Sequence, residues 1–454
     1  MAHPGPFSFI LKFTNSSRHA ARFLFGPTWS RFFLSLLLFA TTVFVMLNTN
    51  SFLRAGTAAL ALGLTPQAAA VLVYVTSYDG TLTSLNLTLS AGGYGPNASQ
   101  AQAKIEQLAV NTGCAPQASW LTLDKPNDIL YCLDENFAGP NGSLSSYKTS
   151  YDGVLEQIKR VPTPNGPVFA TIYGEGARGI AVANYGGGSF STYLKDPNSL
   201  ALVQEATWTL SQPGANPSRQ EAPHPHEVIL DPTGDFFIVP DLGADLVRVF
   251  RINQKNLTWT PVAPLVTPPG SGPRHASFVV VNNKTYMYLT SELVNTVTGY
   301  EVRYTKGHNS SLSFKQVFIS PTHGPGTTVP AGASAAEVIT SPDHRFVLVS
   351  TRSDSAFNIT NFDKANTTEL VSDSITTFKV NPASGSLSLV QLYPSGGQIP
   401  RQFTINKAGT LLGVGDQGSA RAVFINRDVE SGKLTGFAGA IGIAGQVTSV
   451  VFDE

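Results

Sequence analysis

Residues 225–243 of the 454-residue chain read PHEVILDPTGDFFIVPDLG, and this stretch decides the fold. Two apolar runs flank a Pro/Asp/Gly turn, a pattern typical of antiparallel strands, and Asp231 is expected to bond its own turn backbone. The same order of features recurs in ASWLTLDKPNDILYCLDEN (118–136), PRHASFVVVNNKTYMYLTSE (273–292), AAEVITSPDHRFVLVSTRSD (335–354) and PRQFTINKAGTLLGVGDQGS (400–419), with a degenerate copy, ARGIAVANYGGGSFSTYL, at 177–194. A polar alternating run follows most copies and predicts a third strand.

Incomplete copies at the two ends of this region indicate a closed ring. AVLVYVTSYDGTLTSLNLT (70–88) lacks its first strand, and GQVTSVVFDE (445–454) is a first strand with nothing after it. Together they complete one unit and, with the six internal units, give seven. Closure of this kind removes exposed strand edges. We therefore predict an all-β, seven-bladed β-propeller closed by pairing of the N- and C-terminal strands in one blade. The competing fold is a pair of β-sandwiches, in which the separate domains would not share one motif phase.

The composition agrees with a protein built from strands and turns. Charged residues make up 13% of the chain, which also contains 41 Gly and 30 Pro, so it resembles neither a disordered tail nor a long-helix protein. The 30 Lys and Arg balance 30 Asp and Glu without forming a basic cluster. Because phosphate backbones require a basic face, we expect no nucleic-acid partner. We also expect a monomer.

Residues 1–70 are interpreted as an N-terminal signal or possible membrane anchor, and residues 71–454 as the propeller domain. The run 32–47 carries no charge, and the residues before it include Lys12, Arg18, Arg22 and Arg31. At ~1.5 Å per residue it is shorter than a hydrocarbon core of ~30 Å, so it is either cleaved or extended into an anchor. A second signal-like segment, 54–70, ends in three alanines. A buried core helix is the alternative. Either export interpretation places the propeller outside the cytosol, with membrane contact only through this segment.

Glycosylation triplets and cysteines favour the same compartment. The propeller region carries acceptor asparagines at Asn86, Asn97, Asn141, Asn256, Asn283, Asn309, Asn358 and Asn366. So many Asn-x-Ser/Thr triplets in one domain favour a glycosylated, secreted surface. The only two cysteines, Cys114 and Cys132, are predicted to form a disulfide in an oxidising compartment, the alternative being two buried free thiols.

Polar residues recur at fixed positions of the repeat. In a propeller the first strand of each blade lines the axis, so equivalent positions converge there. The starts of the first strands carry His226, Arg274, His275, Glu337 and Arg401, and the positions after the second strands carry Glu135, Asn184, Asp241, Glu292, Arg352 and Asp416. Because charged residues are scarce, this register predicts a site for an anionic, oxygen-rich small molecule. The residues assigned to substrate binding are His275, Glu337, Arg401, Asp241 and Asp416.

These residues also have structural alternatives. Asp241 and Asp416 could cap blade-to-blade turns, and Arg274 and Arg352 could form ion pairs that only tie blades together. His226 could be satisfied by a backbone carbonyl. His224 and His226, two residues apart in an extended segment, could hold a metal ion, but no third ligand lies in sequence range. We therefore predict no metal site.

Several of these motifs together resemble a known family. HPHEVILDPTGDFFIVPDLGADLVRVF, GPRHASF, AAEV with SPDHRFVLVSTR, and IPRQFTI resemble the lactonase family with a seven-bladed β-propeller, which includes bacterial 6-phosphogluconolactonase-like proteins and the fungal carboxy-cis,cis-muconate cyclase. The resemblance covers roughly residues 70–454. It implies hydrolysis of a sugar lactone, or reversible ring closure of a muconate to a lactone. The positions that match the histidine, two arginines and glutamate of the cyclase branch are His226, Arg274, Glu292 and Arg352, which the resemblance implies are catalytic.

The same residues suit either reaction chemically. Opening a lactone needs a base for water and a cation for the oxyanion, roles that His226 and the arginines Arg274 and Arg352 could fill. In ring closure the arginines would bind carboxylates while His226 or Glu292 moves the proton. Neither route needs a metal or organic cofactor. We expect a lactonase-type hydrolase for a small anionic or sugar lactone, with a muconate-type cycloisomerase and a non-catalytic extracellular binding propeller as alternatives.

Overall fold

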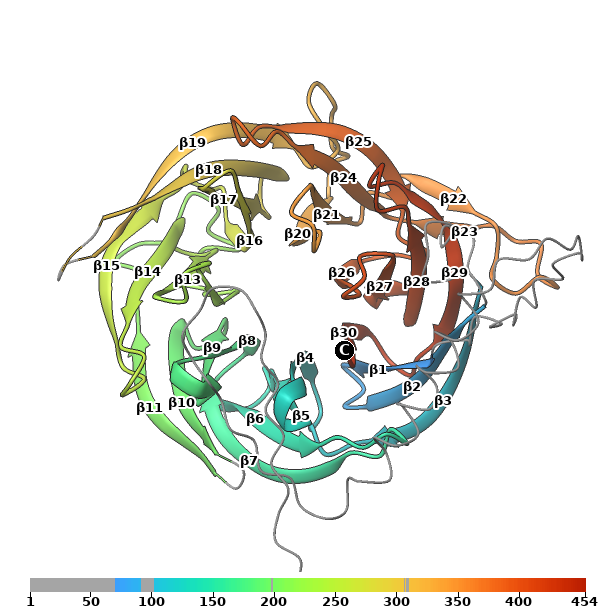
Figure 1. Ribbon diagram of the computed structural model, residues 1–454, viewed down its shortest axis with the longest axis horizontal. Helices are drawn as coiled ribbons and strands as arrows, with labels where there is room; N and C mark the ends of the chain where they lie inside the picture. Colours follow the sequence, from blue (N-terminus) through green and yellow to red (C-terminus); the bar gives the residue numbers. More distant parts are fainter. Residues whose placement is uncertain (1–69, 91–101, 197–198, 306, 308–309) are drawn as a thin grey trace, which may run out of the picture. The chain divides into compact units, whose positions relative to one another are not determined.

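Seven four-stranded antiparallel sheets are arranged around a common axis in the computed structural model (Figure 1). They belong to one compact unit, Leu64–Glu454, of which the structure describes residues 70–90, 102–196, 199–305, 307 and 310–454. The predicted signal or anchor, and the acceptors Asn97 and Asn309, lie outside these ranges. Within them, no helix is long and apolar enough to cross a membrane.

Each blade is an up-and-down sheet whose four strands follow one another from the axis outward. Blades 1 to 4 contain β30 (Val447–Phe452), β1 (Ala70–Ser77), β2 (Leu82–Leu89) and β3 (Ala103–Asn111); β4 (Ala118–Asp124), β5 (Ile129–Asp134), β6 (Asn141–Lys148) and β7 (Glu156–Pro164); β8 (Pro167–Tyr173), β9 (Gly179–Asn184), β10 (Ser189–Asp196) and β11 (Ser199–Thr207); and β12 (Ile229–Leu230), β13 (Phe236–Asp241), β14 (Leu246–Ile252) and β15 (Trp259–Val266).

The remaining blades follow the same plan, with one insertion. Blades 5 to 7 contain β16 (Pro273–Val281), β17 (Lys284–Ser291), β18 (Thr296–Tyr304) and β19 (Leu312–Pro321); β20 (Ser334–Thr340), β21 (Phe346–Arg352), β24 (Ser374–Val380) and β25 (Leu387–Pro394); and β26 (Pro400–Ile405), β27 (Leu411–Asp416), β28 (Arg421–Arg427) and β29 (Leu434–Gly442). A hairpin of β22 (Phe357–Ile359) and β23 (Leu370–Ser372) is inserted in blade 6, and short 3-10 turns are η2 (Lys125–Asn127), η3 (Glu175–Ala177) and η4 (Gln417–Ser419).

The two chain ends close the ring, as the incomplete repeats predict. β30 supplies the innermost strand of blade 1 and pairs antiparallel with β1, with Val75 opposite Val450. The fold prediction is therefore confirmed, and the pair of β-sandwiches is excluded.

Apolar clusters lie between adjacent blades rather than inside single sheets. Four of the second strands, β5, β9, β13 and β27, are buried at every residue, because neighbouring blades cover both of their faces. The clusters of buried residues each combine side chains of two neighbouring blades; one of them joins Leu85 of blade 1 to Phe424 of blade 7. Cys114 and Cys132 form a disulfide within the cluster between blades 1 and 2, with their Cα atoms 6.0 Å apart.

Candidate functional site

A recurrent β-bulge at the start of the first strands positions the charged residues. In blades 5, 6 and 7 the pairing shifts register between Pro273 and His275, between Ala335 and Val338, and between Pro400 and Gln402. These shifts leave Arg274, Glu337 and Arg401 out of the regular pairing. Because a bulge re-aims the side chain of its extra residue, it explains why these long polar side chains leave the alternating pattern of the strand.

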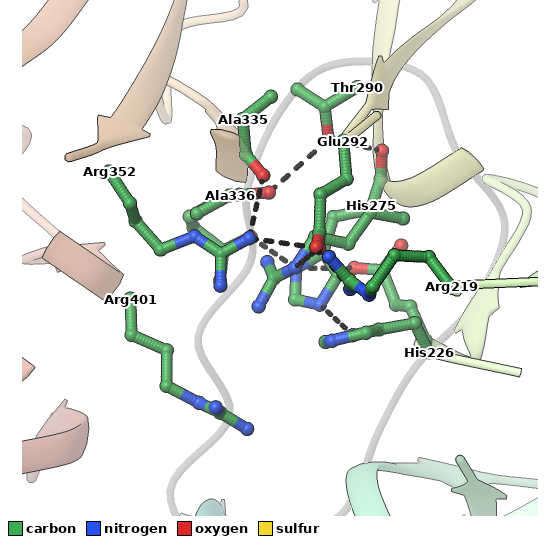
Figure 2. A network of polar contacts seen from close by, with 12 residues as sticks. Arg219, His226, His275, Thr290, Glu292, Ala335, Ala336, Arg352 and Arg401 are labelled. Atoms are coloured by element: carbon green, nitrogen blue, oxygen red, sulfur yellow. Dashed lines mark hydrogen bonds and ion pairs between the residues drawn. The ribbon is translucent and has the colours of Figure 1, made fainter. Parts of the chain in front are cut away.

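Glu292, the residue after β17, is the centre of an arginine cluster. Its Oε2 atom lies 3.0 Å from Nε of Arg274 and 2.9 Å from Nη2 of Arg352, and its Oε1 atom lies 2.5 Å from Nη2 of Arg219. Figure 2 shows Arg219, Arg352 and Glu292 pointing toward one another from different parts of the ring. Arg219 comes from the loop between β11 and β12, so this loop contributes a side chain to the cluster.

Three guanidinium nitrogens in this cluster are buried without a hydrogen-bond partner among the described residues. Nη1 of Arg274 and Nε of Arg352 have no hydrogen-bond partner among the described residues, and the Nε–H of Arg274 is not aligned for a hydrogen bond to Glu292 despite their short separation. Nη2 of Arg352 also donates a hydrogen bond to the carbonyl oxygen of Ala335 at 3.2 Å. Because a buried donor without an acceptor is costly, these nitrogens favour an anionic or carbonyl oxygen as a bound partner.

Two histidines lie next to the arginines. Nδ1 of His226 is 3.0 Å from Nε2 of His275, and Nδ1 of His275 is 2.7 Å from Oε1 of Glu337 (Figure 2 draws the first of these contacts). The backbone N–H of His226 donates to the carbonyl oxygen of Pro240 at 2.9 Å, which fixes the segment that precedes β12. His275 is 1% exposed and His226 is 7% exposed.

The charges of the cluster set the protonation states of its members. Burial lowers the pKa of His226 well below its usual range, and the charge of Arg274 reinforces this effect, so the ring is neutral at pH 7. Burial would raise the pKa of Glu292, but the charges of Arg352 and Arg274 dominate and lower it to about 2. Burial and the charge of Arg352 lower the pKa of Arg274 to about 9. The site therefore combines an unprotonated imidazole with guanidinium groups at neutral pH.

A second ion pair extends the polar lining across the axis. Nη2 of Arg401 donates to Oε1 of Glu135 at 2.7 Å, and the hydroxyl of Tyr78 donates to Oε2 of the same carboxylate at 2.7 Å. The guanidinium of Arg401 also lies 5.3 Å from the centre of the Tyr78 ring. Blades 7, 2 and 1 thus meet in one hydrogen-bonded group.

One group of residues has the ligand spacing of a cation site. The ligand atoms of Glu227, His275 and Glu337 lie within 4.8 Å of one another. However, the separation of 2.7 Å between Glu337 and His275 is a hydrogen-bond distance, and Oε2 of Glu227 accepts the backbone N–H of Ala276 at 2.6 Å. These contacts favour a proton-linked arrangement over metal ligation.

A sequence profile described as "Lactonase, 7-bladed beta-propeller" matches residues 73–452. The chain belongs to this lactonase family. Within it, the chain is 30% identical to the protein named "Probable 6-phosphogluconolactonase" of Arthroderma benhamiae, over 70% of this chain and 75% of the relative. It is 27% identical to the 6-phosphogluconolactonase of Formosa agariphila, over 72% of this chain and 86% of that protein.

Solved structures agree with the lactonase propeller. The periplasmic gluconolactonase PpgL of Pseudomonas aeruginosa superposes with a TM-score of 0.67 and 26% identity, covering 85% of this chain and 99% of the other. These relatives support the family and the fold.

The lactonase propeller brings together all four residues that the resemblance implied to be catalytic. Arg274 and Arg352 both pair with Glu292, and the charges of these two arginines act on His226. Of the residues expected to bind substrate, His275 contacts Nδ1 of His226 through its Nε2 atom, and Glu337 contacts Nδ1 of His275. Arg401 is near the cluster but is paired with Glu135.

Asp241 and Asp416, which were expected to bind substrate, contact other protein groups in the structure, and their part in substrate binding stays a prediction. The carboxylate of Asp241 accepts the backbone N–H groups of His224 and Ala244 and pairs with Arg248, so it caps a blade turn. Asp416 accepts a hydrogen bond from Ser395. A metal ion bound by His224 and His226, the alternative considered above, does not fit the contacts of His224. Its Nδ1 atom contacts the carbonyl oxygen of Tyr185, and its Nε2 atom contacts Glu221.

Three members of the site were not identified from the sequence. Tyr78 follows β1, the second strand of blade 1, and therefore occupies the same repeat position as Glu135 and Glu292; the repeat phase could have identified it. Glu227 follows His226 directly. Arg219 lies in an irregular loop, where no periodicity predicts the direction of a side chain.

Proposed function

We propose that this protein is a lactonase-type hydrolase that opens a small lactone carrying an anionic group. The observation that carries the proposal is the meeting of a neutral imidazole, His226, with buried guanidinium donors of Arg274 and Arg352 that have no protein acceptor among the described residues. Family membership supports the reaction class, and relatives named as gluconolactonases support a sugar-derived ring.

The proposed reaction uses His226 as base and the arginines as electrostatic stabilisers. Nε2 of His226 takes a proton from water while the water oxygen bonds to the lactone carbonyl carbon. Negative charge then develops on the carbonyl oxygen, where Nη1 of Arg274 and Nε of Arg352 would stabilise it. The proton passes to the ring oxygen as the ring C–O bond breaks, which regenerates the base and releases a hydroxy acid.

The charge of the cluster supports an anionic substrate. Four guanidinium groups, those of Arg219, Arg274, Arg352 and Arg401, contact only two carboxylates, Glu292 and Glu135. A phosphate or carboxylate on the substrate would offset the remaining positive charge, with bidentate contacts to guanidinium.

A second candidate is a lactone-forming cycloisomerase. It is favoured by the close approach of Arg274 and Arg352, because adjacent guanidinium groups suit a substrate with several carboxylates. A fall in the ultraviolet absorbance of a carboxymuconate on mixing would identify this reaction.

We also propose that the propeller is exported and glycosylated. Of the described acceptors, Asn141, Asn256, Asn283, Asn358 and Asn366 are exposed and Asn86 is half-buried. A disulfide between the only two cysteines agrees with an oxidising compartment. Mass spectrometry of the mature protein would test both the N-terminus and the glycans; an unprocessed, unglycosylated chain from its native host would contradict this proposal.

The activity is tested with a panel of phosphorylated, carboxylated and uncharged lactones. We expect the wild type to hydrolyse the anionic members, and His226→Gln to lower kcat by at least about 100-fold, the usual effect of removing a general base. His344→Gln, on a turn between β20 and β21, is the matched control. Hydrolysis that never exceeds the uncatalysed rate would contradict the proposal and leave a binding propeller as the interpretation.

A further inference from the structure

A chain of three buried side chains crosses three consecutive blades. Glu337 at the bulge of β20, His275 in β16 and His226 before β12 are linked by contacts of 2.7 Å and 3.0 Å. Trp120 and Phe169 pack edge-on to the His275 ring, with centroid separations of 6.1 Å and 5.5 Å. The apolar surroundings on this side exclude water from the chain of contacts and strengthen its hydrogen bonds.

The contacts determine which nitrogens carry protons. Oε1 of Glu337 also accepts the backbone N–H of Val338 at 3.0 Å, so this oxygen acts as an acceptor and Nδ1 of His275 must be the donor. Burial lowers the pKa of His275 to about 4, although Glu337 acts in the opposite direction, so the ring is neutral and its Nε2 atom carries a lone pair. Nδ1 of His226, 3.0 Å away, must then donate.

A second carboxyl group lies beside this chain of contacts. Oε1 of Glu227 lies 3.7 Å from Nδ1 of His275. Burial and the charge of Glu337 raise the pKa of Glu227 well above its usual range, so Glu227 is protonated at neutral pH. Positive groups near His226 are Arg274, Arg352 and Arg401, and all of them oppose its protonation.

We infer that Glu337 and His275 are positioning residues that hold His226 as its Nδ1–H tautomer and thereby leave Nε2 as the proton-accepting atom of the site. Nε2 of His226 has no hydrogen-bond partner among the described residues, and the opposite tautomer would present an N–H there, which cannot accept a proton from water. When Nε2 takes that proton, the charge of Glu337 stabilises the cation formed on the histidine pair. The catalytic consequence rests on the proposed hydrolase function, whereas the tautomer does not.

The tautomer is tested directly by nitrogen NMR of protein labelled with ¹⁵N-histidine at pH 7. The chain has eight histidines, and the spectrum of His226→Gln identifies the signals of His226. We expect His226 to show a protonated Nδ1 and an unprotonated Nε2, and Glu337→Leu, which removes the acceptor for Nδ1 of His275, to give a mixture of tautomers. A protonated Nε2 in the wild type, or an unchanged His226 spectrum in Glu337→Leu, would overturn the inference.

The pH dependence of kcat/KM provides a second test, because it would not shift if Glu337 only stabilised the fold. For the best lactone, Glu337→Gln should lower kcat about 100-fold with KM within about twofold. The acidic limb of the kcat/KM profile should move to lower pH, because loss of the negative charge lowers the pKa of the histidine pair. Glu301→Gln, on β18 away from the site, is the control and should leave the profile unchanged.

The outcomes separate this inference from the proposed function. If no lactone is hydrolysed but NMR gives the Nδ1–H tautomer in the wild type and a mixture in Glu337→Leu, the positioning role stands and the hydrolase proposal fails. If lactones are hydrolysed but the acidic limb does not move in Glu337→Gln, the positioning role fails. A stoichiometric divalent metal ion in the purified wild type, lost in Glu337→Gln, would also overturn it, because Nδ1 of His275 would then be a ligand rather than a donor.

Discussion

Asp241 and Asp416 end the second strands of blades 4 and 7, yet their carboxyl groups have opposite environments. Asp241 accepts hydrogen bonds from two backbone N–H groups and pairs with Arg248 at 2.8 Å. Asp416 is fully buried; its Oδ1 atom accepts only from Ser395, and its Oδ2 atom has no partner among the described residues. Burial raises the pKa of Asp416 to about 7. Equivalent repeat positions thus carry the same residue type for different reasons.

This contrast predicts opposite effects of the same substitution. Because folded Asp416 binds its proton more tightly than the unfolded chain does, its contribution to the free energy of unfolding falls as pH rises from about 4 to about 7. Asp416→Asn should therefore be more stable than the wild type at pH 8, by up to about 4 kcal/mol, and nearly equal at pH 4. Asp241→Asn should be destabilised by about 1–3 kcal/mol at pH 8. Urea unfolding at both pH values measures these differences; a destabilised Asp416→Asn at pH 8 would contradict the environment described here.

Arg219 is the one arginine of the cluster that comes from a loop, and its side chain is 41% exposed. Its removal should therefore disturb substrate binding more than folding. We expect Arg219→Gln to raise KM for an anionic lactone about tenfold, the effect of losing one partly solvated charged contact, while kcat and the melting temperature change little. Steady-state kinetics with an anionic and an uncharged lactone measure the effect. An equal rise in KM for both substrates would show that the guanidinium does not contact the anion.

For individual residues, the sequence predicted the location of the polar site well, but it did not predict the role of each side chain. The repeat phase placed His226, Arg274, Glu292 and Arg352 together, because equivalent positions of all blades face one axis. It could not distinguish His275, whose two ring nitrogens contact other side chains, from a residue that contacts substrate. That distinction depends on contacts between blades, and such contacts have no local signature.

The turn before β16 holds Glu292 in place. Gly272 has a φ of 60°, donates its N–H to Asp245 at 2.9 Å and accepts the N–H of Glu292 at 2.8 Å. A Cβ atom at this position would lie 2.5 Å from the side chain of Leu293. The turn therefore links a backbone conformation that favours glycine to the position of the central carboxylate.

Gly272→Ala should lower both stability and activity. The positive φ and the contact with Leu293 together should cost about 1–3 kcal/mol, and displacement of Glu292 should lower kcat/KM at least tenfold. Gly436→Ala, in β29, is the control because no atom lies within 4 Å of its added Cβ. Thermal unfolding and lactone hydrolysis measure both effects. Equal behaviour of the two variants would show that this turn does not position the carboxylate.

Elements with a strong turn motif were predictable, and elements without one were not. Asp231 accepts the N–H groups of Thr233 and Phe236, as expected for its DPTG turn. The degenerate copy at 177–194 concealed the first strand of blade 3, β8, because GEGA replaces the usual Pro/Asp/Gly turn. The hairpin of β22 and β23 was also missed, since its three-residue strands lie outside the repeat and are too short to show a period.

For the molecule as a whole, ring closure depends on a terminal strand that is buried on both sides. Val450 of β30 is fully buried in the cluster that joins blades 1 and 7. Val450→Ala should lower the free energy of unfolding by about 1–3 kcal/mol and the melting temperature by several degrees, because it leaves a cavity in the closing interface. Val280→Ala, at a residue 43% exposed, should change stability by less than about 0.5 kcal/mol. Calorimetry of both variants measures this; no loss in Val450→Ala would mean that the terminal strand is not part of the cooperative core.

The proposed function requires that blades 4, 5 and 6 together form one anion-accepting hydrolytic site. A crystal structure with a non-hydrolysable anionic lactone analogue tests this requirement. We expect the ring carbonyl to lie next to Nε2 of His226, and oxygen atoms of the analogue to lie about 3 Å from Nη1 of Arg274 and Nε of Arg352. Binding of the analogue elsewhere on the propeller, with both guanidinium nitrogens still without acceptors, would contradict it.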